Sequence, residues 1–301
     1  MDLEKKSNNL IYTSFGDENE IHNWLDGDKS FDIWGTYYGD NEVSNKTINS
    51  LDFFDKKKLG KLPNFFRLYD KYKEIISSYD SIWLVDDDIK IDNAKIQNLF
   101  RYQNKYGTSI LQPSNSNKGK VNHTITKRIS KSEFRYTNFV EVTAPLFETQ
   151  FLLDWYESQF IPLKQDFQII EHDYLRKHNL KINHENFRDF GLDFWWSHYA
   201  KTKRKKMGIV DKIEMINPLY EGTIQHVKVN ELLGYSEDDA QRMFIQFNNE
   251  FCVKCECEPF NHKCNFKYYD FEHKVLTLYN PFDSECVDTD LGEQIWIWKK
   301  P

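Results

Sequence analysis

Three consecutive aspartates, Asp86-Asp87-Asp88, are the residues of this chain best suited to chemistry. They follow an apolar run at 82–85, which predicts a short buried β-strand that ends at the carboxylates. Alternation along an extended chain directs Asp86 and Asp88 to one side and Asp87 to the other. Carboxylate oxygens suit Mg²⁺ or Mn²⁺, and a cation would relieve the repulsion between adjacent carboxylates. The pattern predicts a divalent-metal site; a solvated acidic turn would have the same short signature.

The surrounding elements must place these carboxylates at a surface. Segments with strand character alternate with segments of helical periodicity, which predicts an α/β fold: a three-layer α/β/α sandwich with a mostly parallel sheet. In such sheets ligands bind at the carboxyl ends of the strands, where the aspartates lie. The expected strands are 9–15, 31–38, 79–85, 108–112, 139–147 and 208–211, and the main expected helices are 64–78, 93–105, 148–160, 165–179 and one that begins near 192.

Composition narrows the class of protein. The chain has 301 residues, 16% of them aromatic, which excludes a disordered chain. Its formal net charge of -7 disfavours a general nucleic-acid coat. We expect no secretory signal and no transmembrane segment, and we place the protein in the cytoplasm. A change in composition near residue 230 predicts a catalytic domain at 1–229 and a separate appendage at 230–301.

A family resemblance adds to this interpretation. The chain from about 60 to 211 resembles the domain-of-unknown-function-707 family, whose members are thought to have the GT-A glycosyltransferase fold. The resemblance implies transfer of a sugar from a UDP- or GDP-linked donor with Mn²⁺ or Mg²⁺ as cofactor. The motifs that carry it, in order along the chain, are KLPNF, YDSIWLVDDDI, ILQPS, HTITKR, FVEVTAPLF, FGLDFWW and GIVD.

The resemblance also implies roles for individual acidic residues. Asp86 would bind both the donor and the metal, and Asp88 would bind the metal. Asp87 is grouped with the donor-binding residues, although we expect it mainly to support local structure. Glu141 would contact the acceptor or the donor sugar, unless it is a strand-end surface residue. Asp193 would be the general base that takes the acceptor proton. A carboxylate stabilised by the dipole at a helix start would explain Asp193 equally simply.

Other positions complete the expected site. Lys127 and Arg128 would hold the donor diphosphate or an anionic acceptor, or else belong to a solvated basic loop. The family often places a histidine shortly after GIVD, and this chain has none there. Asp211 or His226 is therefore the expected third metal ligand. The end of the first strand, 14–17, is where the nucleotide base would be received.

The tryptophans and cysteines leave alternatives open. Trp195 and Trp196 could stack on a sugar, and we expect at least one of them in the core. Four cysteines of the appendage, with a nearby histidine, could form a structural Zn²⁺ site, or remain reduced thiols. The residues concerned are Cys252, Cys255, Cys257, Cys264 and His262.

Three functions compete. A metal-dependent glycosyltransferase is the leading hypothesis, with a glycan, a lipid-linked saccharide, a protein or a modified nucleic acid as acceptor. A nucleotidyl- or phosphotransferase would use the aspartates in two-metal chemistry. A non-catalytic binding module would keep the same fold and would have lost the catalytic activity. Basic runs at 56–58 with Lys61, and at 201–206, could meet a polyanionic acceptor such as DNA or an acidic membrane surface, with nucleic acid as a secondary partner.

Overall fold

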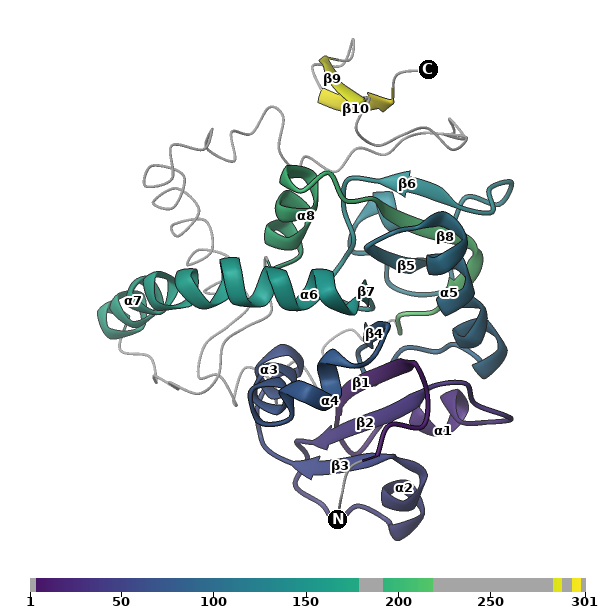
Figure 1. The fold of residues 1–301 in the computed structure, drawn as a ribbon, viewed down its shortest axis with the longest axis vertical. Coiled ribbons are helices and arrows are strands. Elements are labelled where there is room, and N and C mark those ends of the chain that lie inside the picture. The colour runs from purple at the N-terminus through teal and green to yellow at the C-terminus, as the bar shows by residue number, and fades with distance from the viewer. Residues whose placement is uncertain (1–3, 179–191, 219–283, 289–293, 299–301) are drawn as a thin grey trace.

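The computed structural model describes residues 4–178, 192–218, 284–288 and 294–298. Its main sheet has the strand order β3-β2-β1-β4-β7-β5-β8-β6 (Figure 1). The predicted mixed α/β class is confirmed. The strands of this sheet are β1 (Asn9–Phe15), β2 (Asp32–Tyr37), β3 (Phe53–Lys56), β4 (Ser81–Leu84), β5 (Ile110–Asn115), β6 (Arg135–Thr137), β7 (Leu146–Glu148) and β8 (Met207–Met215).

Parallel pairing dominates the sheet. The strands β1 to β4 are all parallel, with β1 between β2 and β4, and β5 is parallel to β8. The short strand β7 is antiparallel to both β4 and β5, and β6 is antiparallel to β8. Since β4 and β5 both run opposite to β7, they point the same way. The carboxyl ends of β1, β4, β5 and β8 therefore lie at one edge of the sheet.

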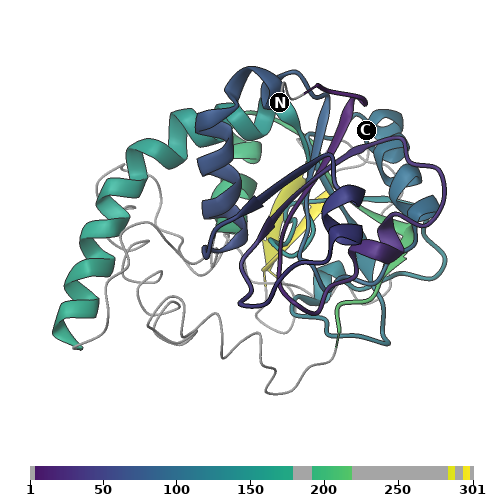
Figure 2. The ribbon, with the colours of Figure 1, turned by 90° about the horizontal axis from the view of Figure 1, so that it is seen from below.

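Helices cover both faces of this sheet (Figure 2). On one face, α3, α4, α6 and α8 pack over Leu10 and Tyr12, and on the other α1 and α5 pack over Ile11. Alternate residues of β1 thus enter two separate cores, which gives the three layers. The helices are α1 (Ile21–Trp24), α2 (Asn45–Ser50), α3 (Lys61–Lys71), α4 (Lys73–Ser77), α5 (Asn93–Tyr106), α6 (Thr149–Trp155), α7 (Ile161–Lys177) and α8 (Leu192–Thr202).

Local signals in the sequence set the ends of α5. The Asp92 side chain accepts a hydrogen bond from the Lys95 amide at 2.9 Å and caps the helix start. Gly107 has a φ of 58° and ends the helix in the left-handed conformation. This helix therefore matches its predicted range, 93–105, closely. The preceding loop carries the acidic triplet, so α5 fixes one end of that loop.

Two predicted elements were wrong in detail. The helix expected at 64–78 is two helices, because the chain leaves helical geometry at Tyr72, where φ is -123°. The strand expected at 139–147 is reduced to β7, which begins at Leu146. The preceding residues bond to side chains instead: the Glu141 amide donates to Gln112 and the Val142 amide to Asp193. The backbone there serves the candidate site rather than a strand ladder.

The end of the chain is described only in part. The strands β9 (Ser284–Asp288) and β10 (Gln294–Trp298) form an antiparallel pair. The rest of the predicted appendage, including the cysteines and His262 proposed for zinc, lies outside the described residues. Among the helices that are described, none combines the length and the apolar character that crossing a bilayer requires.

Candidate active site at the carboxyl edge of the sheet

The acidic triplet directly follows β4, a central strand of the sheet (Figure 1). Asp87 is 6% exposed, whereas Asp86 and Asp88 are both partly exposed. The expected pattern of exposure is present, with the first and third carboxylates at the surface and the second buried, but Asp87 and Asp88 lie in a turn and not in an extended strand. The triplet stands at the edge where the six parallel strands of the sheet end.

Asp87 ties this loop to the neighbouring strands. Its Oδ2 accepts hydrogen bonds from the Gly16 amide at 2.7 Å and from the Tyr38 hydroxyl at 3.3 Å. These partners follow the ends of β1 and β2. Burial raises the pKa of Asp87 well above its ordinary value, and the charges of Asp88 and Asp86 raise it further. Asp87 holds the loop in place, and we leave it out of the ligand-binding set.

Asp86 is paired with a buried lysine, Lys61, which the sequence grouped with the basic run at 56–58. The Lys61 Nζ lies 2.6 Å from Asp86 Oδ1, and the lysine side chain is only 6% exposed. The same ammonium donates to the Val142 carbonyl at 2.6 Å and to the Thr143 carbonyl at 3.2 Å. Lys61 begins α3, in the KLPNF motif. Its position therefore links α3, the aspartate loop and the segment before β7.

The two outward carboxylates are electrostatically costly. Burial, followed by the charge of Asp86, raises the pKa of Asp88 to about 6. Burial also raises the pKa of Asp86, against the lowering effect of Lys61, and the charge of Glu141 adds to the rise. The Asp86 side chain is 42% exposed, so water weakens this effect. A bound cation would offset the cost of burying these carboxylates and the repulsion of Asp88 by Asp86.

The donor set fits a hard cation only in part. The described residues contain no group of three or more His, Cys, Asp or Glu side chains arranged to hold a metal ion. Asp86 and Asp88 would supply two carboxylates. Mg²⁺ and Mn²⁺ sites commonly take one or two protein carboxylates and fill the remaining positions with water and phosphate oxygens. The pair therefore fits a metal that is bound together with a phosphorylated ligand.

Glu141 is a buried carboxylate held by two asparagine side chains, of which Asn115 is buried and Asn122 is exposed. Glu141 is 2% exposed, and its carboxylate accepts hydrogen bonds from Asn122 at 2.6 Å and from Asn115 at 3.3 Å. His123 is close enough that the charge of Glu141 opposes the lowering of the histidine pKa by burial. The alternative of a surface strand-end glutamate is wrong, because Glu141 is buried and lies outside any strand.

Asp193 reaches the same segment from the opposite side. It lies in the first turn of α8, is 4% exposed, and accepts a hydrogen bond from the Val142 amide at 3.3 Å. The carbonyl of Val142 accepts from Lys61, which in turn contacts Asp86. Asp193 and Asp86 are thus joined through one residue, Val142, and one lysine. The structure therefore brings Asp86 and Asp193 together at this edge, with Glu141 next to the Val142 that links them.

Both tryptophans of the FGLDFWW motif belong to the core. Trp196 is fully buried, donates to the Val140 carbonyl at 3.0 Å and packs edge-on against Trp155. Trp195 is 7% exposed and packs with Phe160. Neither presents a ring face for a sugar. Their role is to hold α8, and with it Asp193, against the sheet.

The two basic residues of the HTITKR motif have different surroundings. Lys127 and Arg128 are both exposed. Arg128 forms an ion pair with Glu214 of β8 at 3.0 Å, so its guanidinium is already engaged. The Lys127 backbone carbonyl accepts from Arg135 at 2.7 Å, while its side chain extends to solvent. Of the two, Lys127 is the one whose charge is available to an anionic ligand.

Asp211 has a structural partner instead of an open coordination position. Its Oδ2 pairs with the Arg135 Nε at 3.0 Å and its Oδ1 accepts from the Ile129 amide at 3.0 Å. Both side chains of the ion pair are buried. We therefore drop Asp211 as the third metal ligand. His226, the other residue considered, lies outside the described residues.

The region expected to receive the nucleotide base contains a different aromatic residue from those at 14–17. Phe15 is 1% exposed and belongs to the core. Tyr38, just beyond β2, is partly exposed and touches Asp87 through its hydroxyl. Burial raises the pKa of Tyr38, so the phenol stays protonated. The partly exposed aromatic side chain in this region therefore follows the second strand, β2, and not the first strand, β1.

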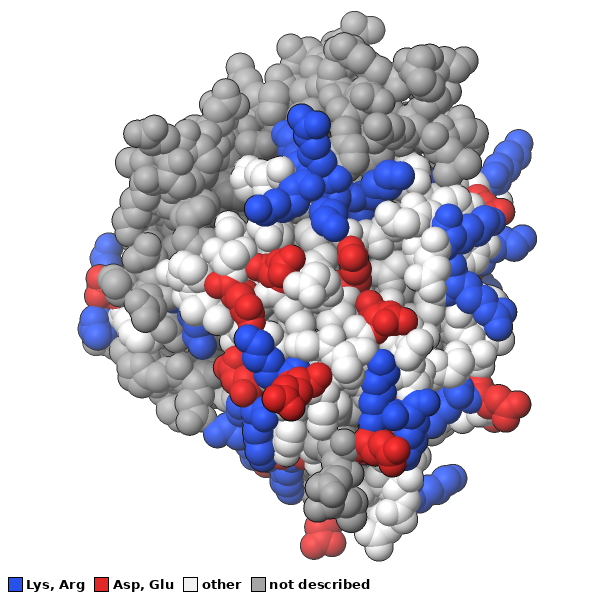
Figure 3. Space-filling model, in the orientation of Figure 1, with Lys and Arg blue, Asp and Glu red and all other residues white. Residues whose placement is uncertain are grey.

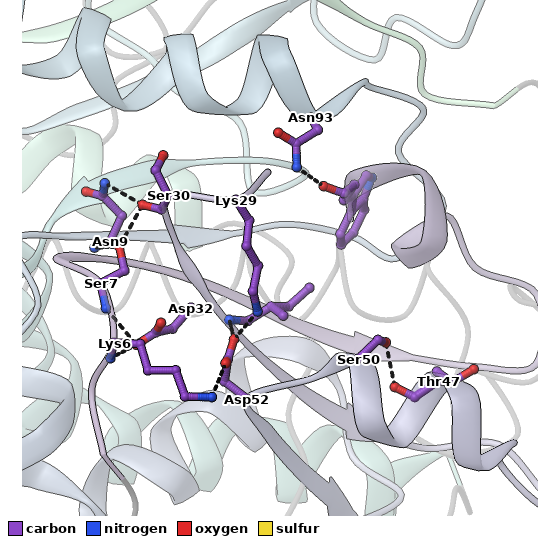
Figure 4. A network of polar contacts seen from close by, with 12 residues as sticks. Lys6, Ser7, Asn9, Lys29, Ser30, Asp32, Thr47, Ser50, Asp52 and Asn93 are labelled. Carbon is purple, nitrogen blue, oxygen red and sulfur yellow. Dashed lines mark hydrogen bonds and ion pairs between the residues drawn. The ribbon is translucent and has the colours of Figure 1, made fainter. Parts of the chain in front are cut away.

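A second acidic cluster occupies the opposite, amino-end edge (Figure 4). Asp52, which precedes β3, pairs with Lys6 at 2.9 Å and Lys29 at 2.5 Å and accepts from the Ile33 amide. Asp32, which begins β2, accepts from the Lys6 amide at 2.9 Å. It also accepts from a tyrosine hydroxyl. These carboxylates are fully engaged in tying strand starts together.

Comparison with known proteins supports the family resemblance. A family model described as "Protein of unknown function (DUF707)" matches residues 69–150, which include the acidic triplet and Glu141. The resemblance drawn from the motifs is confirmed over that range. No curated protein sequence matches the chain.

Solved structures with a similar fold share little sequence. S. aureus TarS, residues 1–349 with UDP-GlcNAc, is 9% identical with a TM-score of 0.45, over 81% of this chain and 72% of that one. GalNAc-T7 with UDP, GalNAc and Mn²⁺ is 9% identical with a TM-score of 0.50, over 82% of this chain and 48% of that one. The chain thus spans about half of GalNAc-T7, with which it shares a fold.

Proposed function

We propose that this protein is a metal-dependent glycosyltransferase of the GT-A type, with its active site at the carboxyl edge of the sheet. One observation carries the proposal: two reachable carboxylates, Asp86 and Asp88, stand at the end of a central strand with raised pKa values and are connected through Lys61 to Asp193. GalNAc-T7, which shares the fold, was solved with UDP, GalNAc and Mn²⁺. A nucleotide-sugar donor is therefore the ligand that we assign to this edge.

The carboxylates would hold the donor diphosphate through a cation. Asp88 and Asp86 supply two oxygen ligands, and the diphosphate would supply others. A bound Mn²⁺ or Mg²⁺ provides Lewis-acid stabilisation of the charge that develops on the departing nucleoside diphosphate. Tyr38 lies beside the loop on the β2 side, where its ring can contact the nucleotide base. Lys127 adds a positive charge from the HTITKR loop.

Asp193 would act as the general base. Its carboxylate is buried and oriented by the Val142 amide, so one oxygen position is fixed. A carboxylate held in this way can take the proton from an acceptor hydroxyl as that oxygen attacks the anomeric carbon. This chemistry inverts the configuration at that carbon. Glu141, held by Asn122 and Asn115, would accept hydrogen bonds from sugar hydroxyls.

The appendage at 230–301 is proposed as a separate unit whose four clustered cysteines, with His262, bind zinc for stability. This part of the proposal is independent of the active site. Zinc content measured by atomic emission on the purified full chain tests it directly. A stoichiometry near one per chain supports it, and the absence of zinc from metal-replete protein contradicts it.

Turnover of the donor tests the proposed function. The full chain is incubated with a panel of UDP- and GDP-sugars, with and without Mn²⁺, and released nucleoside diphosphate is measured. We expect release from one donor that requires Mn²⁺, is lost in Asp88→Asn, and persists in Asp52→Asn at the opposite edge. Release of pyrophosphate from nucleoside triphosphates instead would favour a nucleotidyltransferase. Metal-independent release would contradict the proposal.

A further inference from the structure

A dense basic cluster follows α8. Within six residues the chain carries five cations, Lys201, Lys203, Arg204, Lys205 and Lys206. The first four are exposed and Lys206 is partly exposed. Figure 3 shows a single group of blue side chains over the end of α8. We call these five residues the basic turn.

The last four cations of the basic turn are weakly neutralised by the described part of the chain. Lys205 lies 3.8 Å from Glu148, a long and exposed ion pair. Lys203, Arg204 and Lys206 form no ion pair within the part of the chain that is described. Among the described residues, the basic turn therefore carries a local excess of positive charge in a chain whose net charge is -7.

The other basic run is used differently. Lys58 pairs with Asp40, and Lys56 lies over the Tyr37 ring at 5.2 Å. The nearby Lys61 is buried against Asp86. These contacts spread and neutralise the charge of that run. Of the two runs singled out in the sequence, the basic turn alone concentrates cations at the surface.

Backbone geometry adds a second observation. Arg204 has a φ of 52°, the only positive value among described residues other than glycine. The Lys205 amide donates to the Ala200 carbonyl at 2.8 Å, which closes the helix end at a position that glycine usually occupies. A cation one turn earlier in α8 would interact favourably with the helix dipole and would not need a left-handed backbone conformation. An arginine here costs stability and adds surface charge.

The basic turn faces away from the candidate active site. It leads directly into Met207, the first residue of β8, and Met207 is level with Ile110 at the start of the parallel strand β5. The acidic triplet follows the end of β4, which runs in the same direction as β5. The two features therefore lie at opposite edges of the sheet. A ligand of the basic turn would leave the active-site edge open.

We propose that the basic turn docks the protein onto an anionic membrane surface. Clusters of four to eight Lys or Arg residues are the size that anionic lipids attract. A single-stranded nucleic acid would also need exposed aromatic rings for base stacking. Here Lys203 covers the Tyr199 ring at 5.5 Å and Lys206 covers the Tyr136 ring at 5.5 Å. A compact basic turn whose described aromatic neighbours are covered by lysines suits a planar field of phosphate headgroups.

Vesicle sedimentation of the full chain tests this surface. Vesicles of phosphatidylcholine with about 30% phosphatidylserine are compared with phosphatidylcholine alone. The test variant is Lys203→Gln with Arg204→Gly and Lys205→Gln, which removes three charges and gives the helix end its preferred glycine. The control carries the same loss of charge at dispersed exposed positions, Lys46→Gln, Lys71→Gln and Lys131→Gln.

We expect the wild type to bind only the anionic vesicles and to be released by about 0.5 M salt. Each cation near the surface contributes about fivefold in partitioning, so the test variant should bind about 100-fold more weakly and the control nearly normally. The single change Arg204→Gly should weaken binding while raising the melting temperature, which separates charge from folding. Equal loss in test and control, or unchanged binding in the test variant, overturns the proposal. Tight binding to a 30-base-pair DNA duplex without vesicle binding overturns it as well.

Discussion

The two edges of the sheet hold carboxylates in opposite electrostatic states. At the amino edge, burial would raise the pKa of Asp52, but Lys29, the Ile33 amide and Lys6 outweigh that effect and lower it (Figure 4). At the carboxyl edge, burial and the neighbouring Asp86 raise the pKa of Asp88 to about 6. The same side-chain chemistry therefore stabilises the fold at one edge and opposes it at the other.

This difference indicates where the molecule is built for binding. A carboxylate surrounded by amides and ammonium groups has no need of a ligand. At the carboxyl edge, by contrast, the three adjacent aspartates share one lysine, Lys61. The pKa values of these carboxyl groups stay raised. Natural proteins keep such destabilising arrangements chiefly where function requires them. The comparison can be tested by changing matched residues at the two edges.

The largest expected effect is on donor turnover. Asp88→Asn keeps the shape of the side chain and removes a charge that we assign to metal binding. We expect the rate of nucleoside-diphosphate release to fall about 1,000-fold, the several kcal/mol that metal catalysis supplies. Asp52→Asn should change it by less than about threefold, because that side chain is remote from the carboxyl edge. Comparable losses in both variants would show that the edges do not differ in function.

Asp193→Asn should have the next largest effect. The amide oxygen can still accept from the Val142 amide, so α8 keeps its position. Removal of a general base should lower kcat about 100-fold or more. Nucleotide affinity should be unchanged, because Asp193 is assigned to the acceptor and not to the donor. A loss of nucleotide affinity at unchanged kcat would show that Asp193 contacts the donor rather than the acceptor.

Lys61→Met tests the link between the acidic loop and the segment before β7. Two carbonyls and Asp86 would lose their shared donor, which should cost about 1–3 kcal/mol of unfolding free energy in a denaturant titration. The matched change at the other edge is Lys6→Met. Lys6 is largely exposed and Asp52 keeps Lys29, so no measurable loss is expected. Equal stabilities for wild type and Lys61→Met would remove Lys61 from the account.

The smallest effect is a pH dependence of opposite sign at the two edges. Asp88 has a folded pKa above its unfolded value, so its ionisation destabilises the metal-free protein as pH rises from about 4 to 6. Asp88→Asn should therefore be more stable than wild type by about 1 kcal/mol at pH 7, and this advantage should vanish near pH 4. The folded pKa of Asp52 is lowered, so wild type should exceed Asp52→Asn at pH 7 and lose that advantage as pH falls below 4.

Much of the fold could be predicted because its signals are local. The apolar run before Asp86, the capping Asp92 and the terminating Gly107 each specify an element from neighbouring residues. The segment at 139–145 has the composition of a strand, but its amides bond to Gln112 and Asp193, which are distant in sequence. No local pattern reports such partners. The prediction of a long strand there failed for that reason.

The same limit applies to the candidate site. The sequence correctly predicted which aspartates reach the surface, although Asp87 and Asp88 lie in a turn and not in the extended chain that the prediction assumed. The partners Lys61 of Asp86 and Arg135 of Asp211 lie 25 and 76 residues away, and each changes the role of its carboxylate. Lys61 stands in the KLPNF motif, and a lysine on an otherwise apolar helix start was the signal available. Nothing in the sequence near Asp211 indicates that a buried arginine pairs with it.

Metal-dependent nucleotide binding is the most direct measurement of the central claim. Melting temperatures of wild type, Asp88→Asn and Asp52→Asn are compared with UDP or GDP, with and without Mn²⁺. A ligand at 100 times its Kd stabilises the folded state by about 2.7 kcal/mol. We predict a shift of that order for wild type and Asp52→Asn only when nucleotide and Mn²⁺ are both present, and none for Asp88→Asn. A full shift in Asp88→Asn, or no shift in wild type, would contradict the account.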